Sequence, residues 1–508
     1  MTNPDRLSLL DTELLELEDT SPAHAHVASV LIFEGPGPTI DELTAHVVSR
    51  LDLVPRYRQK LAAVPYRQGR PVWIDDHYFN PGYHVRHTAL PRPGDEGTLA
   101  RLAGRLFSQR LDRTKPLWEL WLVEGLEDDR FALIGKTHHV LVDGVGDLDL
   151  TTVLFDARPD SSPVRAPATK WVARPAPSQA ELLAGALAER VSDPAETARE
   201  VTGLLRRPRA LADGLRHRLA GVGGLAWLGG DPPPRTPLNV AIGPHRRYAW
   251  VDADLERFRR IKTGLGGTVN DVVLTAVAGA LGRYLRSHGH DTDGLVLRAM
   301  VPVWAPAVLG RTGSRVEIVW ARLPVGIVDP RERFAEISQS LDGLKESGRA
   351  VDARVLTELA GFAPGTIISQ AARLQGRSGE ANLTVTNVPG PQSPLFLLGR
   401  RLEAIFPVVP LAAGQAFGVG VLSYCGRLGF GLLADYDAVP DVEAIATELE
   451  AAIEELAALA GAGRRPRRPR RPDGRSVPAD GPAVPSGTPP RGAGGRRSGA
   501  GPGARARR

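Results

Sequence analysis

Two adjacent histidines, followed after three apolar residues by an acid and a glycine, are the side chains of this sequence best suited to chemistry: His138, His139, Asp143 and Gly144. Histidine has an unperturbed pKa of about 6.5, so it can take up and return a proton near neutral pH. Residues 130–137, with the apolar run Phe131 to Ile134, predict a buried strand that holds the imidazoles rigidly. Gly144 permits a close backbone approach. A histidine pair on the surface or in a core gives the same local pattern, so spacing alone leaves both interpretations open.

The composition bounds the class of protein. A chain of 508 residues, 42% of them hydrophobic, is long enough for one large core or two domains. Cys425 is the only cysteine, which excludes a disulfide within the chain and disfavours a cysteine-based zinc site. Residues 1–12 lack the apolar run of a secretory signal, and no stretch reaches the ~18 apolar residues of a membrane span. We therefore expect a cytoplasmic protein.

The charge is unevenly distributed along the chain. The net charge of +5 includes a C-terminal segment, residues 464–508, with thirteen arginines and two aspartates, so the remaining chain carries −6. This segment is rich in Pro, Gly and Arg and is predicted to be disordered, because it holds too little apolar surface to fold. Such a basic tail can attract anionic lipid, at about 1 kcal/mol for each basic residue near the surface. Nucleic acid binding, or a solvated tail without a partner, would fit the same composition.

Apolar periodicity predicts strands and helices mixed along the whole chain. The expected strands are residues 26–34, 117–124, 131–138, 247–251, 296–303, 318–324, 383–388, 404–407, 416–424 and 427–435. The expected helices are residues 11–18, 39–53, 98–109, 147–155, 181–219, 254–263, 268–285, 331–345 and 442–459. Strands and helices do not alternate strictly, which indicates a mixed α/β (α+β) fold in two layered halves.

Shifts in composition suggest where the chain divides. Residues 158–177 are rich in Pro, Ser and Ala, as is typical of a linker. We therefore predict an N-terminal half at 1–160, a linker and helical connection at 161–236, a C-terminal half at 237–460 and a basic tail at 461–508.

Two short motifs outside the histidine pair are further candidates. Pro116 and Trp118 stand at the start of a predicted strand, where a tryptophan is usually part of the core. Asn270 and Asp271 open a long apolar helix, where either residue type is a common N-cap. The functional alternative places the Asn270 amide in a cleft, as a hydrogen-bond donor to a substrate or an oxyanion.

Several other kinds of site lack support. The cluster at residues 288–291 has the types of metal ligands, but no further ligand stands near it in the sequence, so no metal site is predicted. The sequence has no Gly-x-Ser-x-Gly elbow, phosphate-binding loop or dinucleotide fingerprint. What remains is proton transfer by histidine, without a covalent nucleophile or a metal.

The segment His138-His139-Val140-Leu141-Val142-Asp143-Gly144 matches the His-His-x-x-x-Asp-Gly motif of coenzyme-A-dependent acyltransferases. Within that superfamily the chain most resembles the bacterial wax ester synthase/diacylglycerol acyltransferases, over roughly residues 7–458. The ordered motifs that carry the resemblance include Leu9-Leu10-Asp11, Pro116-Leu117-Trp118-Glu119, Asn270-Asp271-Val272-Val273-Leu274, Thr386-Asn387-Val388-Pro389-Gly390-Pro391 and Ser423-Tyr424-Cys425-Gly426.

The resemblance implies a fold and a reaction. The fold would be two chloramphenicol-acetyltransferase-like halves joined by a helical linker, with the active site at their interface. The reaction would move a long-chain fatty acyl group from acyl-CoA to diacylglycerol, and also to long-chain alcohols. Acyl-CoA would be a co-substrate, and no resident cofactor is expected.

The resemblance also assigns roles within the motif. His139 would be the general base that removes the proton of the attacking hydroxyl. His138 would shape the site. Asp143 would be a structural acid that pairs with an arginine and holds the loop.

The remaining candidates would contact or frame the substrates. Gly144 would give the acyl channel room, and Pro116 and Trp118 would line the acyl tunnel or support it. Asn270, with Asp271 beside it, would steady the oxyanion or cap its helix.

Two other functions are compatible with the same sequence. One is an acyltransferase of this superfamily with a non-lipid acceptor, because acceptor choice depends on the shape of the pocket. The other is a non-catalytic protein that binds lipid droplets, which the intact histidine motif disfavours. We expect peripheral contact with a membrane or lipid-droplet surface and no binding of nucleic acid.

Overall fold

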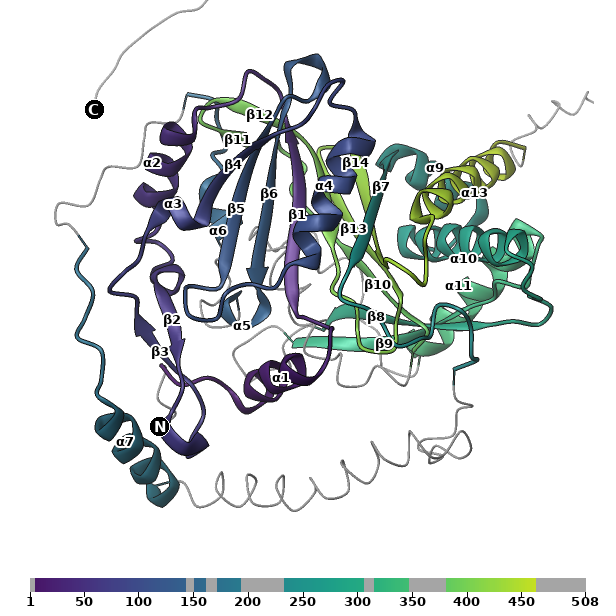
Figure 1. The fold of residues 1–508 in the computed structure, drawn as a ribbon. Helices are drawn as coiled ribbons and strands as arrows, with labels where there is room; N and C mark the ends of the chain where they lie inside the picture. The colour runs from purple at the N-terminus through teal and green to yellow at the C-terminus, as the bar shows by residue number, and fades with distance from the viewer. Residues whose placement is uncertain are drawn as a thin grey trace, which may run out of the picture. The chain divides into compact units, whose positions relative to one another are not determined.

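The first of two six-stranded sheets is built mainly from the N-terminal part of the chain. The computed structural model describes residues 5–142, 150–160, 171–192, 233–305, 315–346 and 381–462. In this sheet the strand order is β11-β12-β1-β6-β5-β4, as Figure 1 shows. The strands are β1 (His26–Phe33), β4 (Val85–Ala89), β5 (Trp118–Glu124), β6 (Phe131–His138), β11 (Phe396–Leu397) and β12 (Arg400–Val408). β1 and β6 pair antiparallel over their whole length and are almost entirely buried, so they form a rigid centre for the site.

Short helices and a two-stranded hairpin surround this sheet. The helices are α1 (Leu9–Thr20), α2 (Ile40–Arg50), α3 (Pro81–His84), α4 (Glu96–Ser108), α5 (His139–Val142), α6 (Leu150–Leu154) and α7 (Gln179–Ser192). The hairpin pairs β2 (Gln59–Ala62) with β3 (Val72–Asp75). Three 3-10 turns lie at Pro55–Arg58, Pro65–Arg67 and Glu127–Asp129. α2 begins with a complete capping box between Thr39 and Glu42, so its start is fixed locally.

The second sheet has the strand order β7-β14-β13-β10-β8-β9. Its strands are β7 (Arg246–Asp254), β8 (Leu297–Ala305), β9 (Arg315–Leu323), β10 (Leu383–Val388), β13 (Phe417–Tyr424) and β14 (Arg427–Asp435). The helices α9 (Leu255–Leu265), α10 (Val269–Ser287), α11 (Pro330–Glu346) and α13 (Val442–Ala462) lie together on one side of it in Figure 1. Fourteen of the nineteen residues of α10 are buried, because the helices α9, α11 and α13 and strand β9 pack against it.

The two halves exchange structure. β12, which follows the second-half strand β10 in the sequence, pairs antiparallel with β1, from Ala28↔Val408 to Phe33↔Leu402. In the other direction, α4 packs against β7 so closely that a Cβ added at Gly104 would lie 3.0 Å from the Arg246 carbonyl oxygen. The predicted fold class, mixed α/β in two sheet-bearing halves, is confirmed. The predicted domain limits stay predictions, since the connection between the halves lies largely outside the described residues.

Most predicted elements are present, with shifts of a few residues at their ends. β6, β10 and β14 have the predicted bounds. The expected helix at 147–155 is confirmed as α6 within the described residues. Of the expected helix at 181–219, the structure describes only the part that lies in α7, which ends at Ser192. β2, β3 and β4 were not predicted. β2 and β3 are only four residues long and stand near prolines, so their apolar pattern is too weak to distinguish them from loops.

Among the described residues, no single helix is both long and apolar enough to cross a membrane, whereas the pair α9–α10, bent by 97°, meets that test of length and composition.

Candidate active site

The backbone fixes the histidine pair where β6 ends and α5 begins. The His138 N–H donates to the Leu117 carbonyl oxygen at 2.9 Å, and the His139 N–H donates to the Ala25 carbonyl oxygen at 2.9 Å. The pair is therefore held between the segments that lead into β5 and β1. Both side chains are buried, at 1% and 0% exposure. The expectation that a buried strand presents the two imidazoles is confirmed.

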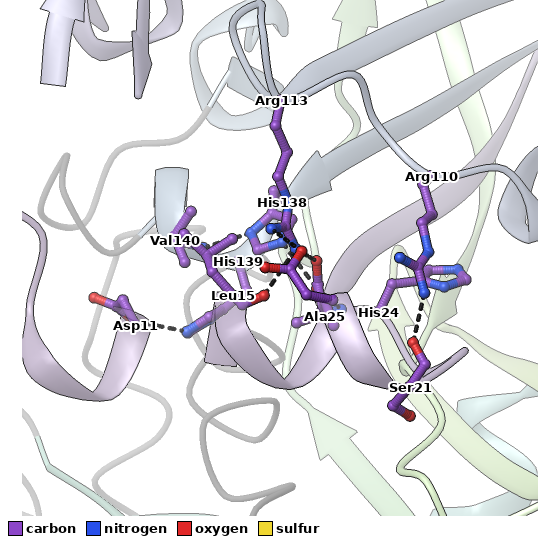
Figure 2. Close-up of polar contacts among 12 residues, drawn as sticks. Asp11, Leu15, Ser21, His24, Ala25, Arg110, Arg113, His138, His139 and Val140 are labelled. Carbon is purple, nitrogen blue, oxygen red and sulfur yellow. Dashed lines mark hydrogen bonds and ion pairs between the residues drawn. The ribbon is translucent and has the colours of Figure 1, made fainter. Parts of the chain in front are cut away.

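Two carboxylates on one face of α1 meet the two imidazoles. Asp11 and Glu18 are seven residues apart, or about two helical turns, so they share a face of the helix. Asp11 Oδ1 lies 3.2 Å from His139 Nε2, and Figure 2 shows these two side chains facing each other. Glu18 Oε1 lies 2.9 Å from His138 Nε2. Each histidine thus has its own carboxylate, and both carboxylates are 4% exposed.

Glu18 joins α1 to the rest of the site. Its Oε1 accepts the Ala25 N–H at 2.6 Å, and its Oε2 accepts Arg113 Nη2 at 2.8 Å. Arg113 approaches from the segment before β5 (Figure 2) and also donates to the Leu15 carbonyl oxygen of α1. Burial raises the pKa of Glu18, but attraction to His138 and the hydrogen bonds from His138, Ala25 and Arg113 outweigh it, so the pKa lies well below its usual 4.5. Glu18 is therefore a carboxylate at neutral pH.

Both ring nitrogens of His138 have a protein partner. Nδ1 accepts the Val140 N–H at 3.2 Å, and Nε2 is left to carry the proton that is donated to Glu18. These contacts fix the tautomer and the orientation of the ring, which is the behaviour of a residue that shapes a site.

Two further histidines extend the cluster, and they were not predicted as part of it. His26 faces His138 across the β1–β6 ladder, with ring centroids 5.6 Å apart. The ring centroids of His24 and His26 are 4.4 Å apart. Burial lowers the pKa of His24 to about 4, although its hydrogen bond to the Phe107 carbonyl oxygen acts in the opposite direction. Burial also lowers the pKa of His26 well below 6.5, assisted by the neighbouring charges. Both imidazoles are therefore neutral at pH 7.

The comparisons with known proteins decide the family. A family model described as "Wax ester synthase/diacylglycerol acyltransferase catalytic domain" matches residues 7–273, and a second, described as "WS/DGAT C-terminal domain", matches residues 312–457. The chain belongs to the wax ester synthase/diacylglycerol acyltransferase family.

Individual relatives agree with this family. The chain is 32% identical over 461 residues to a probable diacylglycerol O-acyltransferase of Mycobacterium tuberculosis, covering 90% of this chain and 96% of that protein. A second probable diacylglycerol O-acyltransferase of that species is 33% identical over 454 residues, covering 85% and 94%. The solved wax ester synthase/diacylglycerol acyltransferase of Marinobacter aquaeolei VT8 has a similar structure, with a TM-score of 0.62, 27% identity and coverage of 90% and 100%.

In this family member, the Pro116–Trp118 motif supports the histidine pair. Leu117 supplies the carbonyl that accepts the His138 N–H, and Pro116 is buried. Trp118 is 1% exposed, donates through Nε1 to the Tyr57 carbonyl oxygen at 2.8 Å, and stacks on His84 with ring centroids 4.5 Å apart. These contacts place Trp118 in the core. The role of Pro116 and Trp118 in lining an acyl tunnel stays a prediction.

In the Asn270-Asp271 motif, Asn270 does not cap helix α10. Thr268 is the N-cap of α10, and its hydroxyl and the Asp271 carboxylate form a reciprocal capping box. Asn270 is therefore not the cap, and that interpretation was wrong. Its Oδ1 accepts Asn387 Nδ2 from β10 at 3.3 Å. Asp271 is 1% exposed, and its carboxylate serves the helix start.

This difference predicts unequal costs for two substitutions. Thr268→Ala removes the cap and should lower the free energy of unfolding by about 1 kcal/mol. Asn270→Ala should cost less than half as much, because it removes one long, half-buried hydrogen bond. Urea unfolding of the two variants checks this difference. An equal cost for both variants would show that Asn270 shares the cap.

Asp143 and Gly144 lie outside the described residues, so the pairing of Asp143 with an arginine and the space at Gly144 stay predictions. Within the described ranges, no group of three or more His, Cys, Asp or Glu side chains could hold a metal ion.

The two carboxylates of α1 are the site residues that the sequence analysis missed. Asp11 appears in the sequence analysis only within the Leu9-Leu10-Asp11 motif, and no role was predicted for Glu18. Their spacing of seven, with the apolar Leu14 and Leu15 between them, is a readable signal that both face inward. The signal does not say which residues they meet.

The neutral histidines predict a loss of stability in mild acid. His24 has a pKa of about 4 when folded and about 6.5 when unfolded, so the unfolded chain binds the proton first. The contribution of neutral His24 to the free energy of unfolding is fully present above pH 6.5. It falls by up to about 3 kcal/mol as the pH decreases toward 4. Urea unfolding at pH 7 and pH 5, followed by tryptophan fluorescence, measures the change. His24→Gln should reduce it, and an unchanged pH dependence in that variant would contradict the assignment.

Proposed function

We propose that this chain transfers a long-chain fatty acyl group from acyl-CoA to the free hydroxyl of diacylglycerol, forming triacylglycerol. The family supports the reaction class, and the Mycobacterium tuberculosis relatives named above support diacylglycerol as the acceptor. The observation that carries the proposal is the buried His139, whose backbone is fixed by Ala25 and whose Nε2 meets Asp11. An imidazole held in this way is suited to act as a general base.

His139 performs the proton transfers. A neutral alcohol is a poor nucleophile, so His139 removes its proton as the oxygen attacks the thioester carbonyl carbon. The tetrahedral intermediate then collapses, the carbon–sulfur bond breaks, and the proton returns to the departing thiolate. Proton transfer of this kind typically contributes 10²–10⁴-fold, and holding both substrates in one site contributes much of the remainder.

The other predicted residues act around this step. His138 shapes the site through its fixed tautomer. The amide oxygen of Asn270 accepts from Asn387, so its NH₂ group is the part that can donate to the oxyanion. Asp271 keeps Asn270 in place by capping the helix.

Contact with a lipid surface is part of the proposal, because diacylglycerol resides in membranes and lipid droplets. The thirteen arginines at residues 464–508 favour an anionic surface. Diacylglycerol presented in vesicles with anionic lipid should therefore be converted faster than in zwitterionic vesicles. Added salt should reduce the difference.

A thiol-release assay tests the acceptor. The purified full chain is given palmitoyl-CoA with diacylglycerol or with hexadecanol, and free thiol is measured. Faster release with diacylglycerol than with no acceptor is the expected result. Release with hexadecanol alone would make the chain a wax ester synthase. No acceleration by either lipid would contradict the proposal and favour a non-lipid acceptor or a non-catalytic role.

A further inference from the structure

Helix α7 and the turn of the β2–β3 hairpin pack together in the N-terminal half. Leu182 and Ala186 of α7 lie against Val64 and Val72, which flank the turn. The helix also contacts the 3-10 turn Pro65–Arg67, and Figure 1 shows it beside the hairpin. The helix and the turn therefore present their outer sides as one surface.

The outer side of α7 carries a second apolar stripe. Four apolar residues follow the spacing i, i+3, i+4, i+7, which places them on one face of the helix: Ala180, Leu183, Ala184 and Leu187. Leu187 is 48% exposed, and Ala180 and Ala184 are exposed as well. The described part of the chain thus leaves this apolar face largely uncovered.

Tyr66 adds an aromatic ring at the turn. Its side chain is 85% exposed, and its φ of 56° lies in the left-handed region that bulky residues rarely adopt. A ring held in solvent by an unfavourable backbone conformation points to a role outside the folded core. Tyrosine is enriched where proteins meet the boundary between water and lipid.

The turn also carries positive charge. Residues 61–74 include Arg67 and Arg70 and no acidic residue. Arg6 brings a third positive charge to the contact with α7, because a Cβ added at Gly185 would lie 3.9 Å from Arg6 Nη2. Arginines beside exposed apolar side chains complement the phosphate groups and acyl chains of an anionic lipid surface.

We propose that this surface, formed by Tyr66 with Ala180, Leu183, Ala184 and Leu187 and named here the hairpin surface, docks the enzyme onto anionic lipid. The inference rests on the proposed function, because it names the surface through which the enzyme reaches a diacylglycerol that resides in lipid. The hairpin surface differs from the basic tail in its forces. Its contacts are mainly apolar and persist in salt, whereas the attraction of the tail is screened.

The test measures binding of the full chain to vesicles that contain anionic lipid, in about 0.5 M NaCl, where the attraction of the tail is screened. The double variant Tyr66→Asn/Leu187→Gln should bind about tenfold more weakly than the wild type, because it removes apolar surface that the lipid would bury. Asparagine tolerates a left-handed φ and glutamine favours a helix, so Tm should stay unchanged.

A tyrosine outside the hairpin surface is the matched control. Tyr78 is 88% exposed and follows β3 at the open end of the hairpin, away from the turn. Tyr78→Asn should bind the vesicles as the wild type does. Equal weakening by Tyr78→Asn and by the double variant would show that any exposed ring contributes, and the inference would be wrong.

Activity assays separate docking from chemistry. With diacylglycerol in vesicles, the double variant should need about tenfold more vesicle lipid to reach its half-maximal rate. With a short-chain diacylglycerol dissolved in water, its kcat should equal that of the wild type. An equal loss of kcat with the dissolved acceptor would place the defect in the active site and overturn the inference.

Two further outcomes are decisive. If the double variant binds vesicles as the wild type does but dissociates an oligomer, the hairpin surface is an interface between copies of the chain and the inference is wrong. If the wild-type chain binds vesicles through this surface but acylates no lipid acceptor, the proposed function fails while the docking surface stands.

Discussion

His139→Ala is expected to abolish triacylglycerol formation in a protein that still folds. The proposed reaction has one proton acceptor, and losing it should lower kcat at least about 10²-fold. The side chain is fully buried, but the backbone bond of His139 to Ala25, which holds the end of β6, survives the substitution. Circular dichroism should therefore report the same secondary structure content for the variant and the wild type.

A matched histidine serves as the control for this prediction. His87 is exposed, and its Nε2 lies 2.7 Å from Glu124 Oε2 at the protein surface. His87→Ala should retain wild-type kcat, since surface ion pairs contribute little. Triacylglycerol is quantified by thin-layer chromatography of the lipid extract. A His139→Ala variant with more than a tenth of wild-type kcat would show that another group removes the proton.

Glu18→Ala is expected to have the largest effect on stability. The substitution removes a buried carboxylate that accepts from His138, from the Ala25 N–H and from the partly exposed Arg113. A buried donor left unpaired typically costs about 1–3 kcal/mol. Asp19→Ala removes the exposed partner of the same arginine and should cost less than about 1 kcal/mol. Urea unfolding at pH 7 compares the two variants. Equal costs would mean that Glu18 is no more important than a surface acid.

The contribution of Glu18 should also depend on pH. Its folded pKa is below the ordinary 4.5, so the unfolded chain takes up the proton first when acid is added. The contribution is therefore present above about pH 4.5 and declines as the pH falls further. The stability gap between wild type and Glu18→Ala should be smaller at pH 3.5 than at pH 7. A gap that widens on acidification would show that Glu18 is protonated in the folded protein.

The histidine strand could be predicted from the sequence because its signal is local. Residues 131–134 form an apolar run that leads within a few residues to the pair, and β6 spans Phe131–His138. The carboxylate partners could not be predicted in the same way. Asp11 lies 128 residues from His139, and Glu18 lies 120 residues from His138. Local patterns show which face of a helix is buried, but they carry no information about what that face meets.

The exchange of β12 between the halves was missed for a similar physical reason. A strand of residues 404–407 was expected, but its pairing with β1 joins segments far apart in the sequence, and nothing in either strand specifies the partner. The error at Asn270 was avoidable. Thr268-x-x-Asp271 is a recognisable capping-box pattern. It identifies Thr268, and not Asn270, as the N-cap of α10.

The most direct test of the account is the stoichiometry of the wild-type reaction. The full chain is incubated with palmitoyl-CoA and diacylglycerol in vesicles, and free thiol and triacylglycerol are measured in the same samples. We expect one triacylglycerol for each thiol released, with both absent in His139→Ala. Thiol release without triacylglycerol would show that water or another acceptor takes the acyl group, and this result would contradict the account.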